Sequence, residues 1–120
     1  MKYPKLRRNT VQAFQRLARL WNVGTTARAT DGILKAWTKG VEIPQEWESK
    51  REAYLDRYTG QMERQGIPLW IEIDGCMYPS PKHLGMIMWG YSPDTARLSN
   101  VKIRVKKLGD KGIYELPRKP

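Results

Sequence analysis

The stretch IPLWIEIDG, residues 67–75, is where the pattern of apolar residues changes along this chain. Within it, leucine and isoleucine side chains recur at every second position, which is typical of a β-strand with one buried face. The stretch ends in Asp74-Gly75, a dipeptide that favours a tight turn. Before this point the apolar residues have a helical period, so the chain divides into a helical first half and a strand-forming second half.

Three segments before residue 67 have the spacing of amphipathic helices. Residues 10–22 and 25–38 form the first two. Residues 44–65 form a third and longer helix, which Pro44 can start and Gly60 can bend or end. The expected apolar faces are Ala13, Phe14, Leu17, Leu20 and Trp21 for the first helix, Ala29, Ile33, Leu34, Ala36 and Trp37 for the second, and Trp47, Tyr54, Leu55, Tyr58 and Met62 for the third.

Shorter segments follow the stretch. Residues 76–84 contain two prolines and are expected to form a loop. Residues 85–91 (GMIMWGY) are a short apolar run and are expected to form a buried strand. Residues 100–107 alternate clearly, and the glycine-rich turn at 109–112 favours a hairpin that pairs this strand with residues 113–116.

Helices followed by strands are typical of an α+β protein. We therefore expect three N-terminal helices followed by a small antiparallel sheet that ends in a β-hairpin. A chain of 120 residues is expected to form a single domain, residues 1–120. The composition also allows a subdivision into a basic helical DNA-binding segment (1–40), a linking helix (41–66) and a β-rich subdomain (67–120).

The positive charge is concentrated near the N-terminus. The formal net charge is +10, with 22 Lys and Arg against 12 Asp and Glu. Residues 1–40 carry nine basic residues against Asp31 alone, a net +8, whereas residues 41–66 carry −2 and residues 67–120 carry +4. Such a field attracts a polyanion, and each phosphate that it neutralises makes binding depend on salt. Nucleic acid is the expected partner, and an acidic protein is the alternative.

The single cysteine, Cys76, excludes an intrachain disulfide. The N-terminus leads into no apolar segment of a signal peptide, and no run approaches the roughly 18 apolar residues of a membrane span. We expect a cytoplasmic protein without a membrane partner, although basic amphipathic helices can bind anionic lipid as well as DNA.

Residues 14–26 (FQRLARLWNVGTT) end one helix, turn at a glycine and begin a second helix with a threonine cap. This junction, within residues 3–38, resembles that of ribbon–helix–helix DNA-binding proteins. The resemblance implies a homodimer in which residues 5–8 (KLRR) pair with their copy as a two-stranded ribbon in the major groove. It also implies that the cap at Thr25 or Thr26 presents backbone N–H groups to a phosphate.

Two alternatives to this arrangement stay open. A helix-turn-helix unit would place Arg28, Thr30 and Lys35 in the groove instead. An ordinary helical hairpin would leave the same basic residues in water.

A second basic element is the strand that carries Lys102, Arg104 and Lys106. Alternate residues of a strand stand about 6.6 Å apart on one face, so the row can follow a phosphate backbone. The alternatives are a solvated outer face and lysines that protect a sheet edge from aggregation. The full set of expected nucleic-acid-binding residues is Lys5, Arg7, Arg8, Arg16, Arg19, Thr25, Arg28, Lys35, Lys102, Arg104, Lys106 and Lys107.

Four aromatic residues, Tyr78, Trp89, Tyr91 and Tyr114, lie in the second half of the chain. Aromatic side chains placed among basic residues can stack on unpaired bases. Packing in the core is the commoner use of such residues and is the expectation here.

The carboxylates of Glu72 and Asp74 at the end of a strand point to a metal-dependent nuclease, because such enzymes hold Mg²⁺ with clustered carboxylates. The lysine that usually accompanies them is absent. Cys76 and His83, even with Asp74, are too few ligands for a structural zinc site. We therefore expect no enzyme activity, no metal and no cofactor.

These residues predict a non-catalytic nucleic-acid-binding protein, with duplex DNA favoured over RNA, that acts as a transcriptional regulator or accessory factor. The first alternative is a small mobile-element or phage-type protein that binds and inhibits, or adapts, a larger nucleic-acid-processing machine, since Trp and Tyr are typical interface anchors. The second alternative is the nuclease.

Overall fold

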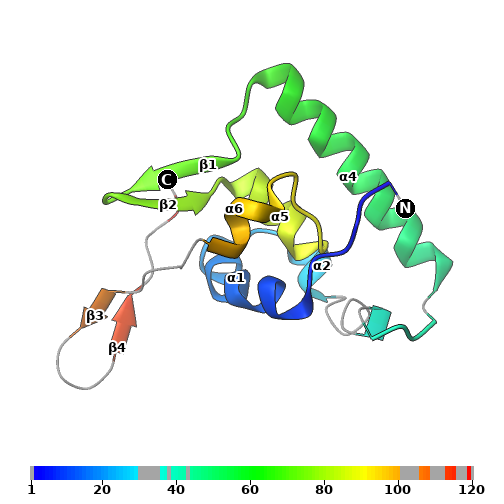
Figure 1. The fold of residues 1–120 in the computed structure, drawn as a ribbon, viewed down its shortest axis with the longest axis horizontal. Coiled ribbons are helices and arrows are strands. Elements are labelled where there is room, and N and C mark those ends of the chain that lie inside the picture. The colour runs from blue at the N-terminus through cyan, green and yellow to red at the C-terminus, as the bar shows by residue number, and fades with distance from the viewer. Residues whose placement is uncertain are drawn as a thin grey trace.

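Figure 1 shows the computed structural model of the chain, in which helices and strands are mixed. It describes residues 2–29, 36–37, 39–42, 44–100, 106–108, 113–115 and 119. Before the first hairpin come the helices α1 (Arg8–Leu20), α2 (Thr25–Ala29) and α4 (Gln45–Gln65). The later elements are the hairpin β1 (Trp70–Ile73) and β2 (Cys76–Pro79), the helices α5 (Pro81–Met88) and α6 (Thr95–Asn100), and the hairpin β3 (Lys106–Leu108) and β4 (Ile113–Glu115). The expected mixed class, with helices before an antiparallel sheet, is confirmed.

The expected number of helices is wrong, because the described residues contain five, two of which follow the first hairpin. Residues 76–79 are a strand rather than a loop, and residues 85–88 belong to α5 rather than to a strand. A short apolar run fits a buried helix as well as a buried strand, so its period does not decide between them. The sequence before the run favours the helix, since Ser80 Oγ accepts the N–H of His83 at 3.4 Å and Pro81 takes the first helical position.

Helix α5 is the centre of the core. Its residues 83–88 are all buried, and α1, α2, α4 and β2 pack against it (Figure 1). A helix that is apolar on nearly every side needs such cover. Gly85 allows the closest approach, because a Cβ at this position would collide with the hydroxyl group of Tyr54 on α4.

Helix α1 packs one face on α5 and exposes the other. Its buried residues are Val11, Phe14, Leu17 and Ala18. The burial of Phe14 and Leu17 confirms part of the predicted face, but Ala13 and Leu20 are exposed, Leu20 to 51%. The row that packs on α5 begins at Val11 and includes Ala18, so the buried face is rotated away from Ala13 and Leu20.

Helix α4 follows its prediction closely. Its inner face consists of buried Trp47, Leu55 and Met62 and half-buried Tyr54 and Tyr58. Pro44 stands at the N-cap, one residue before the helix, and Gly60 lies inside the helix without ending it. The helix ends at Gly66, whose φ of 62° is the left-handed conformation that glycine adopts at no steric cost.

One charged side chain shares the inner face of α4. Arg51 is 4% exposed and donates hydrogen bonds to the backbone oxygens of Trp89 (2.7 Å), Tyr3 (2.9 Å) and Gly90 (3.2 Å). Burial lowers the pKa of Arg51 to about 10, so the guanidinium is still charged near neutral pH. The N–H of Leu6 also donates to Gly90 O at 2.7 Å. Arg51 therefore joins the C-terminal end of α5 to the N-terminal segment.

The predicted C-terminal hairpin is present, and a hairpin that was not predicted pairs residues 70–73 with residues 76–79, which were expected to form a loop. Asp74, with φ 51°, and Gly75, with φ 79°, form the turn between β1 and β2, and both values suit a two-residue hairpin turn. In the second hairpin, β3 pairs with β4 in an antiparallel register that places Lys107 opposite Tyr114.

Two predicted elements reach beyond the described residues. Helix α2 accounts for residues 25–29 of the predicted helix 25–38, and residues 30–35 lie outside the described residues. Of the predicted strand 100–107, residue 100 ends α6, residues 101–105 lie outside the described residues, and the last two residues belong to β3.

Candidate nucleic-acid interface

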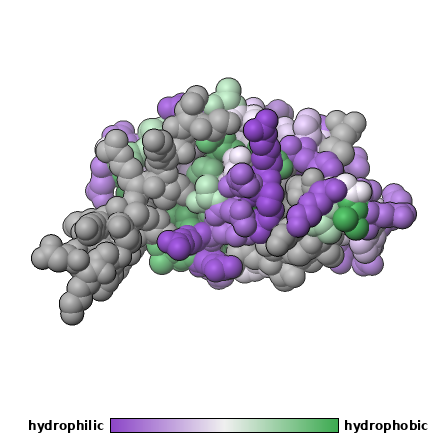
Figure 2. Space-filling view, turned by 60° about the horizontal axis from the view of Figure 1, so that its bottom comes forward, coloured by the Kyte–Doolittle hydropathy of each residue, from purple (hydrophilic) through white to green (hydrophobic). Residues whose placement is uncertain are grey.

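The outward face of α1 is basic and carries no acidic residue. No Asp or Glu precedes Asp31 in the chain, whereas residues 1–30 contain seven Lys and Arg. Arg16 and Arg19 are exposed on this helix, and Arg7, also exposed, stands directly before it. Figure 2, which turns the lower side of Figure 1 toward the reader, shows hydrophilic side chains gathered over the middle of this side of the molecule.

Other basic side chains are engaged within the chain. The Nζ atom of Lys2 lies 2.8 Å from Asp56 Oδ1, and this hydrogen bond raises the pKa of Lys2 and lowers the pKa of Asp56. By contrast, within the part of the chain that the structure describes, no ion pair joins Arg16 or Arg19 to a carboxylate. Among the described residues, their charges therefore have no anionic partner and face solvent.

The N-terminal segment, expected as a ribbon, packs on its own chain. Residues 2–7 contain no strand, and Tyr3 and Leu6 are buried. Lys5 Nζ donates to Trp37 O at 3.1 Å and lies 4.3 Å from the centroid of the Trp37 ring. Pairing of this segment with a second subunit stays a prediction, and Lys5 contacts a carbonyl and a ring within its own chain.

The remaining predicted site residues are dispersed. Arg8 is half-buried in the first turn of α1, and Thr25 is exposed at the start of α2. Three more belong to described elements, Arg28 to α2 and Lys106 and Lys107 to β3. Outside the described residues lie Lys35, Lys102 and Arg104, together with Thr30 of the alternative arrangement. Of the predicted set, α1 therefore groups Arg16 and Arg19 on its outward face, with Arg7 at its start.

Two side chains that the sequence analysis did not place at the site lie on the same face of α1. Asn9 and Gln12 are both exposed. Gln12 stands four residues before Arg16, a spacing that already indicates a shared helical face. Asn9 was outside the predicted helix 10–22, and only the observed start at Arg8 adds it to that face.

The aromatic residues serve the core. Tyr78 and Trp89 are 4% and 3% exposed, which confirms the core interpretation for both. Tyr91 is half-buried and rests edge-on against Tyr3, with ring centroids 5.0 Å apart. The side chain of Tyr114 lies outside the described residues. Tyr78 and Trp89 therefore present no open platform for unpaired bases.

His83 makes a buried polar link. Its Nδ1 lies 2.9 Å from Leu69 O, an oxygen that only accepts, so Nδ1 carries the proton. Its Nε2 then accepts from Ser92 Oγ at 2.8 Å. His83 and Ser92 are 0% and 4% exposed, and burial lowers the pKa of His83. Because both ring nitrogens are occupied by Leu69 O and by the buried hydroxyl of Ser92, His83 connects α5 to the loops that contain Leu69 and Ser92.

The carboxylates considered for metal binding stand apart from other ligands. Glu72 is exposed on β1 opposite Met77, and Asp74 is exposed in the turn. Cys76 is half-buried at the start of β2. Among the residues described by the structure, no three His, Cys, Asp or Glu side chains are grouped closely enough to hold a metal ion.

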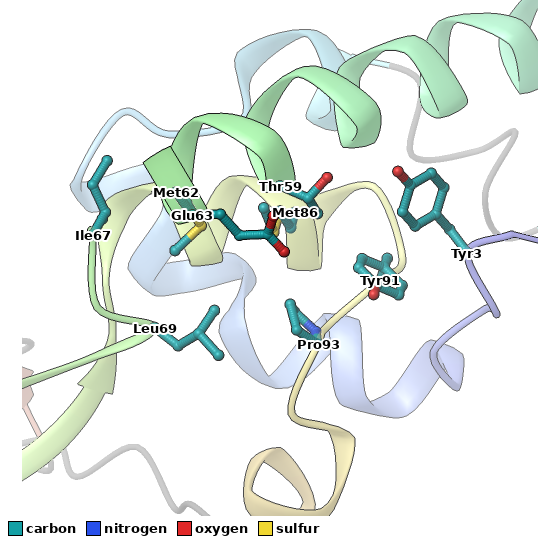
Figure 3. A pocket seen from close by; sticks show the side chains of 9 residues that line it. All are labelled: Tyr3, Thr59, Met62, Glu63, Ile67, Leu69, Met86, Tyr91 and Pro93. Carbon is teal, nitrogen blue, oxygen red and sulfur yellow. The ribbon is translucent and has the colours of Figure 1, made fainter. Parts of the chain in front are cut away.

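A separate pocket lies beside the C-terminal half of α4 (Figure 3). Its volume is about 470 Å³, which is within the range of sites that hold a small molecule or a partner's side chains. Met62, Met86 and Leu69 supply apolar lining, while Tyr91 and Glu63 add polar groups.

No helix in the described ranges combines the length and the apolar character needed to cross a membrane. No protein-family model, curated protein or solved structure shows significant similarity to this chain. A function therefore has to be derived from the sites themselves.

Proposed function

We propose that this protein is a non-catalytic nucleic-acid-binding protein that binds duplex DNA through α1 and acts in the cytoplasm as a transcriptional regulator or accessory factor. The observation that supports the proposal is the exposed, acid-free basic face of α1, with Arg16, Arg19 and the neighbouring Arg7. Guanidinium groups pair with phosphate oxygens in a bidentate geometry and release counterions on binding.

The way in which α1 is held supports the same function. Phe14 and Leu17 are 1% and 0% exposed, so the inner face of the helix is anchored on α5 while its outer face is open to a ligand. Lys106 and Lys107 of β3 would add a second contact with the phosphate backbone, and a homodimer would double the basic surface.

The proposal is tested by measuring the affinity for a short fluorescent DNA duplex across a salt series. Affinity should fall steeply as salt rises. The variant Arg16→Gln/Arg19→Gln should weaken binding at low salt and reduce the slope of log K against log salt, because two positive charges that face the DNA are removed.

The matched control is Lys50→Gln/Arg57→Gln on α4, which removes the same charge from exposed positions. It should change the slope far less. Absence of binding at low salt would refute the proposal, and equal losses in the two double variants would show that net charge, rather than α1, determines binding.

An adaptor that binds a larger protein is the second candidate, and the pocket of Figure 3 is the observation that favours it. Its apolar lining could take an apolar side chain of a partner. Pro93→Arg would place a long charged side chain at this site from an exposed position. Capture of one partner after nuclease treatment, lost in Pro93→Arg and kept in Arg16→Gln/Arg19→Gln, would support an adaptor; capture unaffected by Pro93→Arg would argue against it.

A further inference from the structure

The polar side chains of the outward face of α1 allow the proposed function to be made more specific. We infer that α1 lies in the major groove of duplex DNA and recognises base edges through Asn9, Gln12 and Arg16. This inference rests on the proposed function, because it requires that the protein bind duplex DNA at this face.

The three side chains form one row. Their spacing of three and then four residues places them on the same side of a helix, and all three are exposed. The helix has 13 residues and is therefore about 20 Å long. The major groove, about 12 Å wide, admits one α-helix, so α1 fits along it with this row facing the bases.

The chemistry of the row is that of base recognition. Asparagine and glutamine amides can pair with N6 and N7 of adenine, and an arginine can pair with O6 and N7 of guanine. Ala13 and Leu20 were expected on the buried face of α1, but both are exposed beside the row, Leu20 to 51%. Their methyl groups suit the C5-methyl group of thymine, whereas phosphates offer them no contact.

The flanking charges and the buried face complete the arrangement. Arg7 precedes the helix and Arg19 lies near its end, so both can bind phosphates and set the orientation of the row. The inner face, with Phe14, Leu17 and Ala18 at most 1% exposed, keeps the helix rigid on α5. Base recognition requires such rigid support, because a loosely held side chain does not distinguish donor from acceptor positions.

The test begins with selection of binding sites by the full chain from a pool of random DNA duplexes. We expect an enriched motif of a few base pairs. Gln12→Ala, and Arg16→Lys with its charge kept, should each reduce discrimination at one base pair roughly 5- to 150-fold. The salt slope should stay nearly unchanged, because neither variant removes a charge.

Replacing purines of the motif by their 7-deaza analogues removes the N7 acceptor in the major groove and should weaken binding to a similar extent. Duplex RNA of the same sequence should bind less well, since its major groove is too deep and narrow for a helix. The control is Gln65→Ala, an exposed amide on α4, which should leave the motif unchanged.

The outcomes separate the two proposals. Salt-dependent binding without base preference, or a motif unaffected by both variants and by the 7-deaza bases, would overturn base recognition by α1 while leaving DNA binding intact. Preference for single strands or duplex RNA would also overturn it. Absence of duplex binding at low salt would overturn the proposed function as well. Each variant changes an exposed side chain, so an unchanged unfolding midpoint serves as the check on folding.

Discussion

Helices α1 and α4 contain similar numbers of basic residues and use them differently. Helix α1 has three, all without an acidic residue in the helix, whereas α4 has four among five Asp and Glu. On α4, Lys50 lies 3.4 Å from Glu46, and Asp56 holds Lys2 of the N-terminal segment. The comparison teaches that the absence of nearby carboxylates, rather than the density of basic residues, distinguishes the candidate interface.

The two helices also differ in where an arginine lies. Arg51 of α4 is buried and donates to three carbonyl oxygens, so its charge stabilises the packing of the chain on itself. Arg16 of α1 is exposed, so its charge is available to a ligand. Substitutions on the buried side should therefore change stability, and substitutions on the exposed side should change binding.

Arg51→Ala is expected to have the greatest effect on stability. It removes three charge-assisted hydrogen bonds and leaves buried carbonyl oxygens without those donors, so the free energy of unfolding should fall by about 3 kcal/mol or more. Denaturant unfolding measures this loss. Arg51→Lys, which keeps the charge without the planar fork, gives a folded intermediate case. Arg57→Ala on the exposed side should stay within about 0.5 kcal/mol, and an equal loss there would contradict the distinction.

Gly85→Ala should have the next effect. The added Cβ would collide with the hydroxyl group of Tyr54, and forcing it into the core should cost about 1–3 kcal/mol. Tyr54→Phe removes that hydroxyl group and should recover part of the loss in the double variant. Gly60→Ala within α4 is the control, because a Cβ there meets the flexible end of Arg64 and should stabilise the helix by up to about 1 kcal/mol. If the losses of Gly85→Ala and Tyr54→Phe simply added in the double variant, the hydroxyl group of Tyr54 would not be the group that the new Cβ meets.

The pH dependence of stability should be moderate and should depend on His83. Burial lowers the pKa of His83 from 6.5, so the unfolded chain binds a proton at a higher pH than the folded chain does. The contribution of His83 to stability should thus be constant above pH 6.5 and fall as the pH decreases from 6.5 through the lowered pKa. His83 is the chain's one histidine, so His83→Gln should flatten the profile between about pH 7 and about pH 5. A slope that persists in this variant would assign the pH dependence to other groups.

The smallest effect is expected for Arg16→Gln/Arg19→Gln. Both side chains are exposed, so the free energy of unfolding should change by less than about 0.5 kcal/mol. The same variant is expected to lose affinity for DNA, and the two measurements together test whether α1 separates binding from stability. A loss of stability similar to that of Arg51→Ala would show that these arginines are structural.

Much of the fold could be predicted because its signals are local. The alternation that begins at Leu69 predicted β1, and Asp74-Gly75 predicted the turn after it, whereas β2 was expected to be a loop. Helix α4 lies almost where its period placed it. Helix α5 could not be predicted from its apolar run, because that run is buried on both sides in either secondary structure.

The sequence predicted that the candidate site is basic, but it did not predict which side chains make up the site. Arg16 and Arg19 followed from the basic N-terminal helix, but Asn9 required the observed start of α1. Lys5 was expected at the ligand and instead contacts Trp37, which is distant in the sequence. The pattern of residues within one segment does not show which side chain of a distant segment will contact it.

The amino-acid order alone therefore determined helices α1 and α4, strand β1, the C-terminal hairpin and the acid-free charge of the first 30 residues, because period and charge are properties of neighbouring residues. Tertiary packing decided which side of α1 faces solvent, that Leu20 and Ala13 lie beside Gln12 and Arg16, and that Arg51 is buried. Exposure depends on which elements cover a face. Here α5, which the apolar pattern did not predict as a helix, covers the inner face of α1 and leaves the basic face of α1 open.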